Sequence, residues 1–179
     1  MVAVTPLGVS AVIRILGVAL VGVALLGLPA AAQTGSNIIA GQSAGSLRIG
    51  TSVSDVIAAL GSLYESEDSE SGKYTLYDWP LKPFAVAVDK ESNRVVLVLV
   101  GFTDAFSTDK GIAGGSERQA VETAYGKEYT ASEGSRSTRI IYDELGIAFD
   151  LGRSGTLSSK VTQIFIFVPG QWKAIMEGL

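Results

Sequence analysis

The 179-residue chain contains no cysteine and no histidine. Without histidine, Ser-His-Asp triads and histidine acid–base sites are unavailable, and without either residue type the usual zinc sites and cysteine nucleophiles are excluded. No disulfide can form, so stability has to come from packing. The acceptor for an N-terminal lipid on cysteine is missing as well. We therefore expect a non-enzymatic protein with no cofactor and no metal, with an oxygen-only calcium or magnesium site as the open alternative.

Basic residues are also few, with 14 Lys and Arg against 18 Asp and Glu and a net charge of −4. They form no cluster, and phosphate contacts by basic residues supply most of the affinity for nucleic acid. Anionic membrane surfaces select for the same clusters. The sequence therefore predicts a chain that binds neither. The spaced carboxylates Glu65, Asp68 and Glu70 lack the ligand pattern of a calcium loop and are interpreted as a solvated loop.

The N-terminus has the pattern of an export signal. One charge, Arg14, precedes the uncharged run 15–28, and Pro29-Ala-Ala-Ala32 supplies small residues at a cleavage site. The alternative is an uncleaved anchor, but the apolar run is short of the about 20 residues that span a bilayer. We expect a signal peptide at 1–32, no membrane segment after cleavage, and a periplasmic or secreted protein.

One stretch near the start of the mature chain predicts a capped helix. Thr51 and Ser52 can cap it, and Asp55 lies in its first turn, where a negative charge is favourable. Gly61 ends it, because glycine adopts the left-handed conformation at low cost. The apolar stripe of this helix is Val53, Val56, Ile57 and Leu60.

Three strands are predicted after this helix, and the same order follows in the second half of the chain. The predicted strands are 73–79, 84–88 and 94–100, then 139–143, 147–151 and 161–168. The run Val95–Val100 is apolar throughout, which indicates a central strand covered on both faces. A second helix is expected after Ser116, with Gly126 as its end. In the tail, Trp172, Ile175 and Met176 share a helical face that we expect to fold back on the body.

The two halves match at an offset of 65 residues. Identical pairs are Gly50/Gly115, Val56/Val121, Ala59/Ala124, Gly61/Gly126, Tyr64/Tyr129, Tyr77/Tyr142, Asp78/Asp143, Phe84/Phe149 and Val96/Val161. A helix on a three-stranded meander is marginal alone, and two units that share a sheet bury more surface. We therefore predict an α+β fold in which two tandem α-β-β-β repeats form one antiparallel sheet of about six strands, with the helices on one face.

The chain divides accordingly into six parts. These are the signal peptide 1–32, a flexible arm 33–46 with room for a short edge strand, repeat 1 at 47–100, a linker 101–111, repeat 2 at 112–168 and a C-terminal tail 169–179.

The pattern Leu47-x-Ile-Gly-Thr-x-x-x-Asp-Val-x-x-x-Leu-Gly61, followed by a meander, resembles the SmpA/OmlA-like module of small outer-membrane assembly lipoproteins. Its tandem duplication is similar to the β-lactamase-inhibitor-protein (BLIP) fold, in which two helix-plus-sheet modules make a concave sheet. The lipid-bearing cysteine of the assembly proteins is absent here, and the second copy, from Gly114 to Val121, matches loosely. The resemblance implies the fold, and no binding residue of either family carries over.

Aromatic residues near the strand ends are the candidate binding residues. Tyr74, Tyr77, Trp79 and Tyr142 offer contact area with a polar group if they lie on an open sheet face. The alternative is that Tyr77 and Tyr142 pack in the core. Tyr74 and Trp79 have no aromatic counterpart at the offset of 65, so they are the better candidates for a surface specific to this protein.

These observations favour an exported binding or adaptor module that contacts another envelope or secreted protein, direct inhibition of a secreted enzyme being one version. A second hypothesis is a small-ligand or cell-wall glycan-binding domain in which the aromatics stack on sugars. A third is a hydrolase in which Asp78 and Asp143 form a carboxylate pair. Function is expected where the two copies differ.

Overall fold

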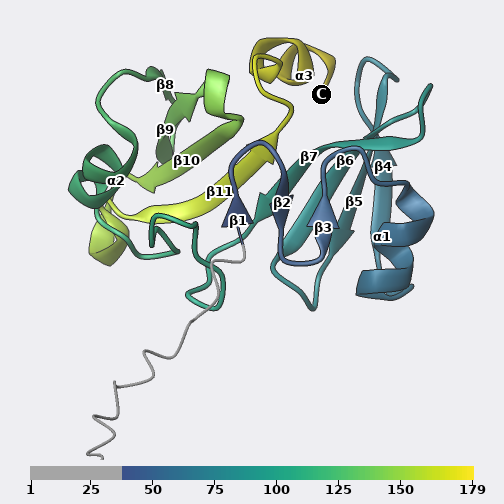
Figure 1. Ribbon diagram of the computed structural model, residues 1–179, viewed down its shortest axis with the longest axis horizontal. Helices are drawn as coiled ribbons and strands as arrows, with labels where there is room; N and C mark the ends of the chain where they lie inside the picture. Colours follow the sequence, from purple (N-terminus) through teal and green to yellow (C-terminus); the bar gives the residue numbers. More distant parts are fainter. Residues whose placement is uncertain (1–37) are drawn as a thin grey trace, which may run out of the picture. The chain divides into compact units, whose positions relative to one another are not determined.

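The computed structural model describes residues 38–179 (Figure 1). The expected signal peptide 1–32 and the first residues of the expected arm lie outside this part. The described elements, in chain order, are β1 (Ile38–Ile39), β2 (Ser43–Ala44), β3 (Leu47–Arg48), α1 (Val53–Leu60), β4 (Glu65–Asp68), β5 (Tyr74–Trp79), β6 (Phe84–Asp89), β7 (Arg94–Val100), α2 (Arg118–Tyr125), β8 (Thr130–Glu133), β9 (Ser137–Tyr142), η1 (Asp143–Leu145), β10 (Ile147–Gly152), η2 (Gly155–Leu157), β11 (Val161–Phe167) and α3 (Trp172–Gly178).

The fold is α+β, as predicted, and is built on one antiparallel sheet with the strand order β4-β5-β6-β7-β11-β10-β9-β8. The expected number of about six strands is wrong, because this sheet has eight. The two additional strands are its edges, β4 and β8, and every residue of both is exposed. Neither sequence shows the alternation of apolar and polar residues that predicts a strand, so the sequence analysis did not predict these two strands.

Each half contributes four strands in chain order, counted from the edge of the sheet to its centre. The first half is β4-β5-β6-β7, the second half is β8-β9-β10-β11, and the two halves meet at β7 and β11. The central strand β7 pairs with β6 and β11 and buries residues on both faces, as its apolar run predicts. Leu99 lies opposite Phe165 at the centre of this pairing. A short second sheet, β1-β2-β3, lies in front of the large one between α1 and α2 (Figure 1).

The same backbone joint connects each helix to the last strand of its half. In the first half, the Gly50 N–H donates to the Val95 carbonyl at 2.8 Å, and the Val95 N–H donates to the Thr51 carbonyl at 2.9 Å. In the second half, Gly115 and Ser116 make the same two bonds with Val161, both at 2.8 Å. Gly50 and Gly115 have φ of 80° and 87°, a region that favours glycine. The repeat seen in the sequence is therefore a repeat of this joint.

The C-terminal ends of α1 and α2 are also duplicated. The aromatic residues that bond to them are not the ones that the sequence alignment pairs. Gly61 and Gly126 both have φ of 92°. The Gly61 carbonyl accepts a bond from Trp79 Nε1 at 2.8 Å, and the Gly126 carbonyl accepts one from the Tyr142 hydroxyl at 2.7 Å. An aromatic at the end of the following hairpin strand thus satisfies an orphan polar group at each helix C-terminus.

Trp79 and Tyr142 are therefore equivalent, which corrects the pairing of Tyr77 with Tyr142 and of Asp78 with Asp143. Trp79 pairs with Phe84 across the first hairpin, and Tyr142 pairs with Ile147 across the second. The turn between β8 and β9 is two residues shorter than the turn between β4 and β5, so the offset changes from 65 to 63 within the repeat. An ungapped alignment misses this shift.

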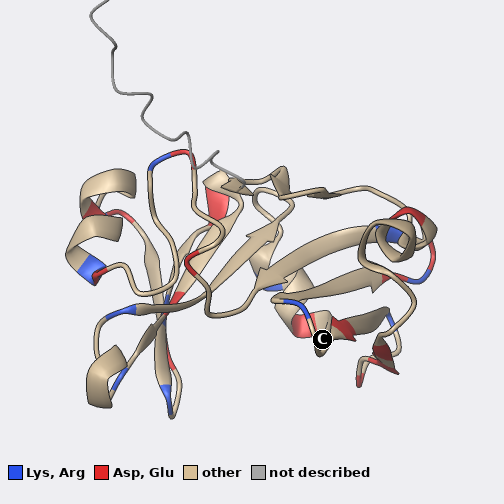
Figure 2. Ribbon diagram, turned by 90° about the horizontal axis from the view of Figure 1, so that it is seen from below, with Lys and Arg blue, Asp and Glu red and all other residues tan. Residues whose placement is uncertain are grey.

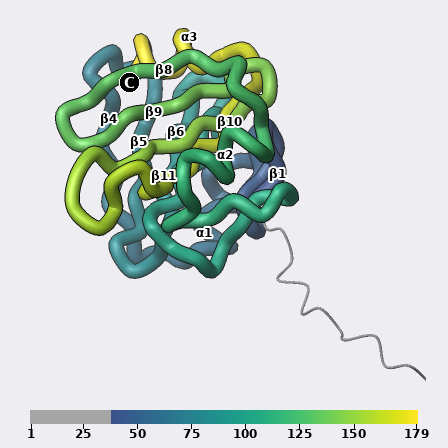
Figure 3. Tube along the Cα trace, turned by 90° about the vertical axis from the view of Figure 1, so that its left-hand side faces the viewer, coloured from purple at the N-terminus to yellow at the C-terminus, as the bar shows by residue number. Residues whose placement is uncertain are grey.

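The large sheet has a core on each face. The first face packs against α1, α2 and the β1–β3 sheet, through buried residues such as Val56, Val121 and Leu47. The second face packs against α3, whose Ile175 is 2% exposed. Seen from the β8 side, α2 and α3 lie on opposite sides of the strands (Figure 3). The expectation of helices on one face thus holds for α1 and α2, and α3 departs from it.

The segment 38–46 differs from the expected flexible arm. It contributes β1 and β2, and Ile38 and Ala44 are fully buried in the first core. The Ile38 N–H donates to the Ser107 carbonyl at 3.0 Å, which ties this segment to the 101–111 connection. The Gly, Ser and Ala content suggested a flexible arm. Small residues also allow the β1–β3 sheet to lie close to the large sheet.

The predicted helix caps hold for one helix only. The Ser52 hydroxyl oxygen accepts a bond from the Asp55 N–H at 3.3 Å, which confirms the first cap. In the second half the N-cap is Glu117, without a side-chain bond, and the Ser116 hydroxyl oxygen accepts from the Ala113 N–H instead. Ser116 is therefore part of the joint and does not cap α2.

The tail folds back on the body, as its spacing of apolar residues predicts. The ring of Trp172 lies 4.9 Å from that of Phe167 and 5.8 Å from that of Phe165, centroid to centroid. At the other end of α3, the Ser71 hydroxyl donates to the Gly178 carbonyl. α3 therefore contacts both halves of the sheet.

A charged cluster lies beneath α3. Arg139 makes a bidentate contact with Asp150 at 2.6 and 2.8 Å, and Asp150 is only 4% exposed. The guanidinium lies 4.2 Å from the Phe165 ring centroid and 5.2 Å from that of Trp172. In the first half, the equivalent strand positions hold the uncharged pair Leu76 and Ala87.

We predict that Tyr142→Phe lowers the free energy of unfolding by about 1 kcal/mol, because the Gly126 carbonyl loses its partner. Tyr77→Phe is the matched control, since the Tyr77 hydroxyl makes no hydrogen bond to the described residues. Urea denaturation followed by circular dichroism measures both. Equal losses in the two variants would contradict the role of this bond.

We predict that Arg139→Leu destabilises the fold by about 3 kcal/mol, because it leaves a buried carboxylate without a partner. The double variant Arg139→Leu/Asp150→Ala installs the pair found in the first half and should recover most of that loss. Thermal and urea unfolding of the single and double variants provide the test. A double variant no more stable than the single one would refute this account of the ion pair.

Candidate binding surface

The four aromatics proposed as binding residues do not form an open surface. Tyr74, Trp79 and Tyr142 are 3%, 1% and 4% exposed, and Tyr77 is half-buried. Trp79 and Tyr142 hold the helix ends, and Tyr74 packs against Gly178 of α3. The packing alternative therefore fits these positions. The offset of 65 suggested that Trp79 is unique to its half, but its counterpart is Tyr142.

The two candidate catalytic carboxylates are not brought together. Asp78 is at the end of β5 and Asp143 directly follows β9, five strand positions away in the sheet. At about 4.8 Å per strand this is roughly 24 Å, and the two strands run in opposite directions, so the residues lie at opposite ends. A carboxylate pair for glycoside hydrolysis needs roughly 5 to 9.5 Å. Asp143 instead accepts a bond from the Trp172 N–H at 3.0 Å.

Charges of both signs are interspersed over the part of the chain that the structure describes (Figure 2). Within residues 38–179, no three His, Cys, Asp or Glu side chains are grouped as a metal site would require. In the same residues, no helix has the length and apolar character needed to cross a bilayer.

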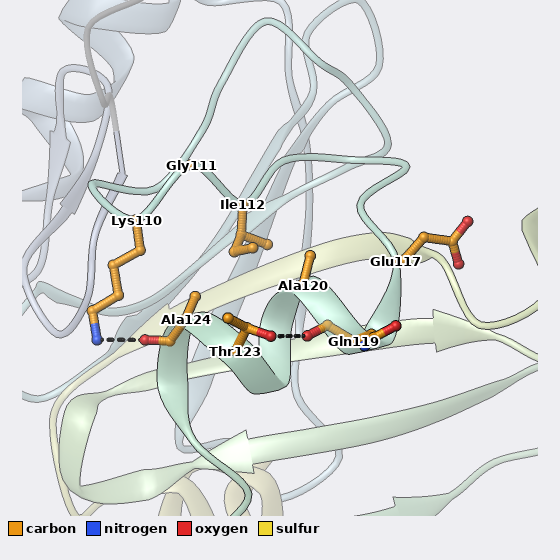
Figure 4. A pocket seen from close by; sticks show the side chains of 8 residues that line it. All are labelled: Lys110, Gly111, Ile112, Glu117, Gln119, Ala120, Thr123 and Ala124. Atoms are coloured by element: carbon orange, nitrogen blue, oxygen red, sulfur yellow. Dashed lines mark hydrogen bonds between the residues drawn. The ribbon is translucent and has the colours of Figure 1, made fainter.

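A hollow of about 640 Å³ lies beside α2 (Figure 4). Lys110 points along its edge, and its Nζ donates to the Ala124 carbonyl at 2.9 Å and lies 4.5 Å from the Tyr125 ring centroid. A lysine at a helix C-terminus satisfies an orphan carbonyl and offsets the helix dipole. The most prominent charge of this hollow is therefore engaged in structural contacts.

α2 carries a compact, half-buried polar group that α1 lacks. Arg118 donates to Glu122 at 2.8 Å and to the Tyr129 hydroxyl at 2.6 Å. The Arg118 bond, followed by a 2.9 Å bond from the Tyr129 hydroxyl to Glu122, lowers the pKa of Glu122. In the first half, the equivalent positions at the same offset of 65 are Val53, Ile57 and Tyr64. Val53, Ile57 and Tyr64 pack against the first core, so the second half has a polar contact where the first half has an apolar one.

Three large apolar side chains are strongly exposed at one end of the first half. Leu63, Leu81 and Phe102 are 75%, 84% and 58% exposed. The Trp79–Gly61 bond and a 2.8 Å bond from the Gly101 N–H to the Pro83 carbonyl bring their segments to the same end of the sheet. We define these three residues as the apolar end.

Two of the three positions of the apolar end hold glutamates in the second half. Leu63 corresponds to Glu128 at the offset of 65, and Leu81 corresponds to Glu144 at the offset of 63. Residue type alone did not single out these leucines, since scattered surface leucines are common. The sequence signal was the position of Leu81, which lies in a turn bounded by Pro80 and Pro83 and cannot enter a core strand.

No protein-family model matches the chain, and no curated protein sequence matches it either. Among solved structures, the uncharacterized protein yfeY from Escherichia coli has a TM-score of 0.52 at 13% identity, over 72% of this chain and 98% of that one. This likeness concerns the fold alone. Two weaker matches are an extracellular protein containing an SCP domain from Bacillus anthracis str. Ames (TM-score 0.46, 11% identity, 69% and 45% coverage) and a DUF4309 family protein, YjgB, from Bacillus subtilis (0.44, 12%, 72% and 88%).

We predict that the protein loses stability as the pH rises from about 10 to about 12. Burial raises the pKa of Tyr125 and of Tyr142 to about 12. The folded state therefore keeps protons that the unfolded tyrosines release near 10, so rising pH favours unfolding. Urea midpoints across this range should fall less steeply for Tyr142→Phe than for the wild type. Leu157→Ala, which keeps both tyrosines, should retain the wild-type slope, and identical slopes in all three proteins would count against the assignment.

Proposed function

We propose that the chain is an exported, non-enzymatic protein-binding module of the cell envelope or the extracellular space, acting as an adaptor or inhibitor of another envelope or secreted protein. The observation that carries this proposal is the apolar end of Leu63, Leu81 and Phe102. Burying a leucine side chain is worth about 1.5 to 3 kcal/mol, so three exposed apolar side chains at one end of the sheet offer the centre of an interface.

The comparison of the two halves supports a role for this end in binding. Structural requirements recur in both copies, as at Gly50 and Gly115, whereas the positions of Leu63 and Leu81 hold glutamates in the second copy. Packing therefore gives no reason for these leucines. The export pattern at 1–32 supports an envelope or extracellular location, and the resemblance to SmpA/OmlA-like and BLIP-like modules is compatible with a partner protein.

A glycan-binding domain is less favoured by the same geometry. Of the aromatic residues within 38–179, only Phe102 is exposed. Stacking on sugars needs an accessible ring face, and the four aromatics first considered are buried or half-buried. The widely separated Asp78 and Asp143 likewise leave the hydrolase hypothesis without its pair.

We predict that Leu63→Glu/Leu81→Glu, which installs the residues of the second half, reduces partner recovery from an envelope extract by about tenfold or more. The matched control is Leu145→Glu, because Leu145 is 43% exposed in the equivalent turn of the second half. Quantitative affinity capture of the three proteins, with circular dichroism to verify folding, makes the comparison. Equal recovery by the double variant and the wild type would remove this surface.

A further inference from the structure

The edge strand β4 and the groove beside it continue the apolar end. β4 pairs with β5 alone, so its outer backbone edge is open, and no described turn or loop bond involves Glu65 to Asp68. A groove of about 360 Å³ runs along it, lined by Glu65, Ser66, Glu67, Leu76, Tyr77, Asp78 and Ala85. An open strand edge is a ready template for a further strand.

The pairing register decides which side chains face the groove. Glu65 pairs with Asp78 and Glu67 with Leu76, and paired residues lie on the same face of a sheet. Asp78 in turn pairs with Ala85. The second face of the sheet therefore presents a half-buried apolar floor of Leu76 and Ala85, bordered by three carboxylates. Leu63 lies two residues before Glu65, at the end of this edge that adjoins the apolar end.

The three carboxylates are not neutralised within the described residues. Glu65, Glu67 and Asp78 are exposed and take part in none of the ion pairs there, whereas their neighbour Asp68 is paired with Lys90 at 2.8 Å. Like charges placed directly opposite each other, as Glu65 and Asp78 are, destabilise a strand pair. At the other edge of the sheet, the equivalent residues are Thr130, Ser132 and Ile141, which are uncharged. The charge is specific to this edge and makes it complementary to a basic partner.

We propose that β4 receives an extended segment of a partner protein in which lysine or arginine alternates with apolar residues. Backbone hydrogen bonds would add this segment as a strand. Its basic side chains would lie on the face of Glu65, Glu67 and Asp78, and its apolar side chains would lie on the opposite face, beside Ser66. This inference rests on the proposed function and names the chemistry of the partner.

A second copy of the chain is a poor occupant of the same edge. Pairing β4 with β4 would set glutamates against glutamates, and β8 offers no basic residue, since it reads Thr-Ala-Ser-Glu. Electrostatics thus disfavours self-association through this edge and favours a partner of opposite charge.

The test uses the protein and two synthetic probes of about six residues, one alternating lysine with valine and one alternating glutamate with valine. We expect the lysine probe to shift the amide resonances of β4 and β5 and to bind more weakly as salt rises. Glu65→Gln/Glu67→Gln/Asp78→Asn should weaken this binding by about tenfold, and the control Glu128→Gln/Glu144→Gln should leave it unchanged. Equal binding of the two probes, or shifts confined to β8, would overturn the proposal.

Capture from the extract separates this inference from the proposed function. Suppose that Leu63→Glu/Leu81→Glu loses the partner while the three amide substitutions retain it at every salt concentration. The proposed protein-binding function is then supported, and the proposal of a basic strand added to β4 is wrong. If the amide substitutions also lose the partner, the inference is supported. Dimerisation of the wild type that maps to β4 by amide shifts would replace the basic partner with a second copy and overturn the inference.

Discussion

The backbone joint between each helix and the last strand of its half is the constraint on which the fold depends. Two hydrogen bonds fix the entry of α1 to β7, through Gly50, Thr51 and Val95, and the same two fix α2 to β11. Because β7 and β11 are neighbours at the centre of the sheet, both helices are set on the same face from one shared pair of strands. The other strands of each half follow from this centre to the polar edge strand, β4 or β8.

Duplication also explains how the two halves differ. The joint and the aromatic bond to each helix end recur, although the aromatic is Trp79 in one half and Tyr142 in the other. Outside these contacts the two halves differ in their charged and apolar residues. The second half buries an ion pair beneath α3 and surrounds α2 with polar contacts, whereas the first half exposes leucines and carries unpaired carboxylates at its edge. We therefore propose that binding occurs at the first half.

Much of the fold could be predicted from the sequence, because its signals are local. Helix periodicity, the capping residue Ser52, the terminal glycines and the six apolar strands follow from short-range chemistry. The edge strands could not be predicted, because their polar residues show no alternation and they are held by backbone pairing alone.

The candidate site was less accessible to sequence reasoning. A two-residue difference in the length of one turn makes Trp79 equivalent to Tyr142, which an ungapped alignment does not show. Leu81 differs from a buried leucine only in its exposure, which is a property of the folded chain. Tyr74 illustrates the same point, since what covers it is Gly178, more than a hundred residues away.

The most direct measurement of the central claim, that the duplicated joint serves structure while binding lies elsewhere, compares Gly50→Ala with Gly115→Ala. An added Cβ meets no atom within 4 Å at either position, so each substitution isolates the cost of the positive φ. The account predicts matched losses of about 1 kcal/mol in unfolding free energy, with partner capture unchanged. A loss at one glycine only, or loss of capture by a stably folded variant, would contradict it.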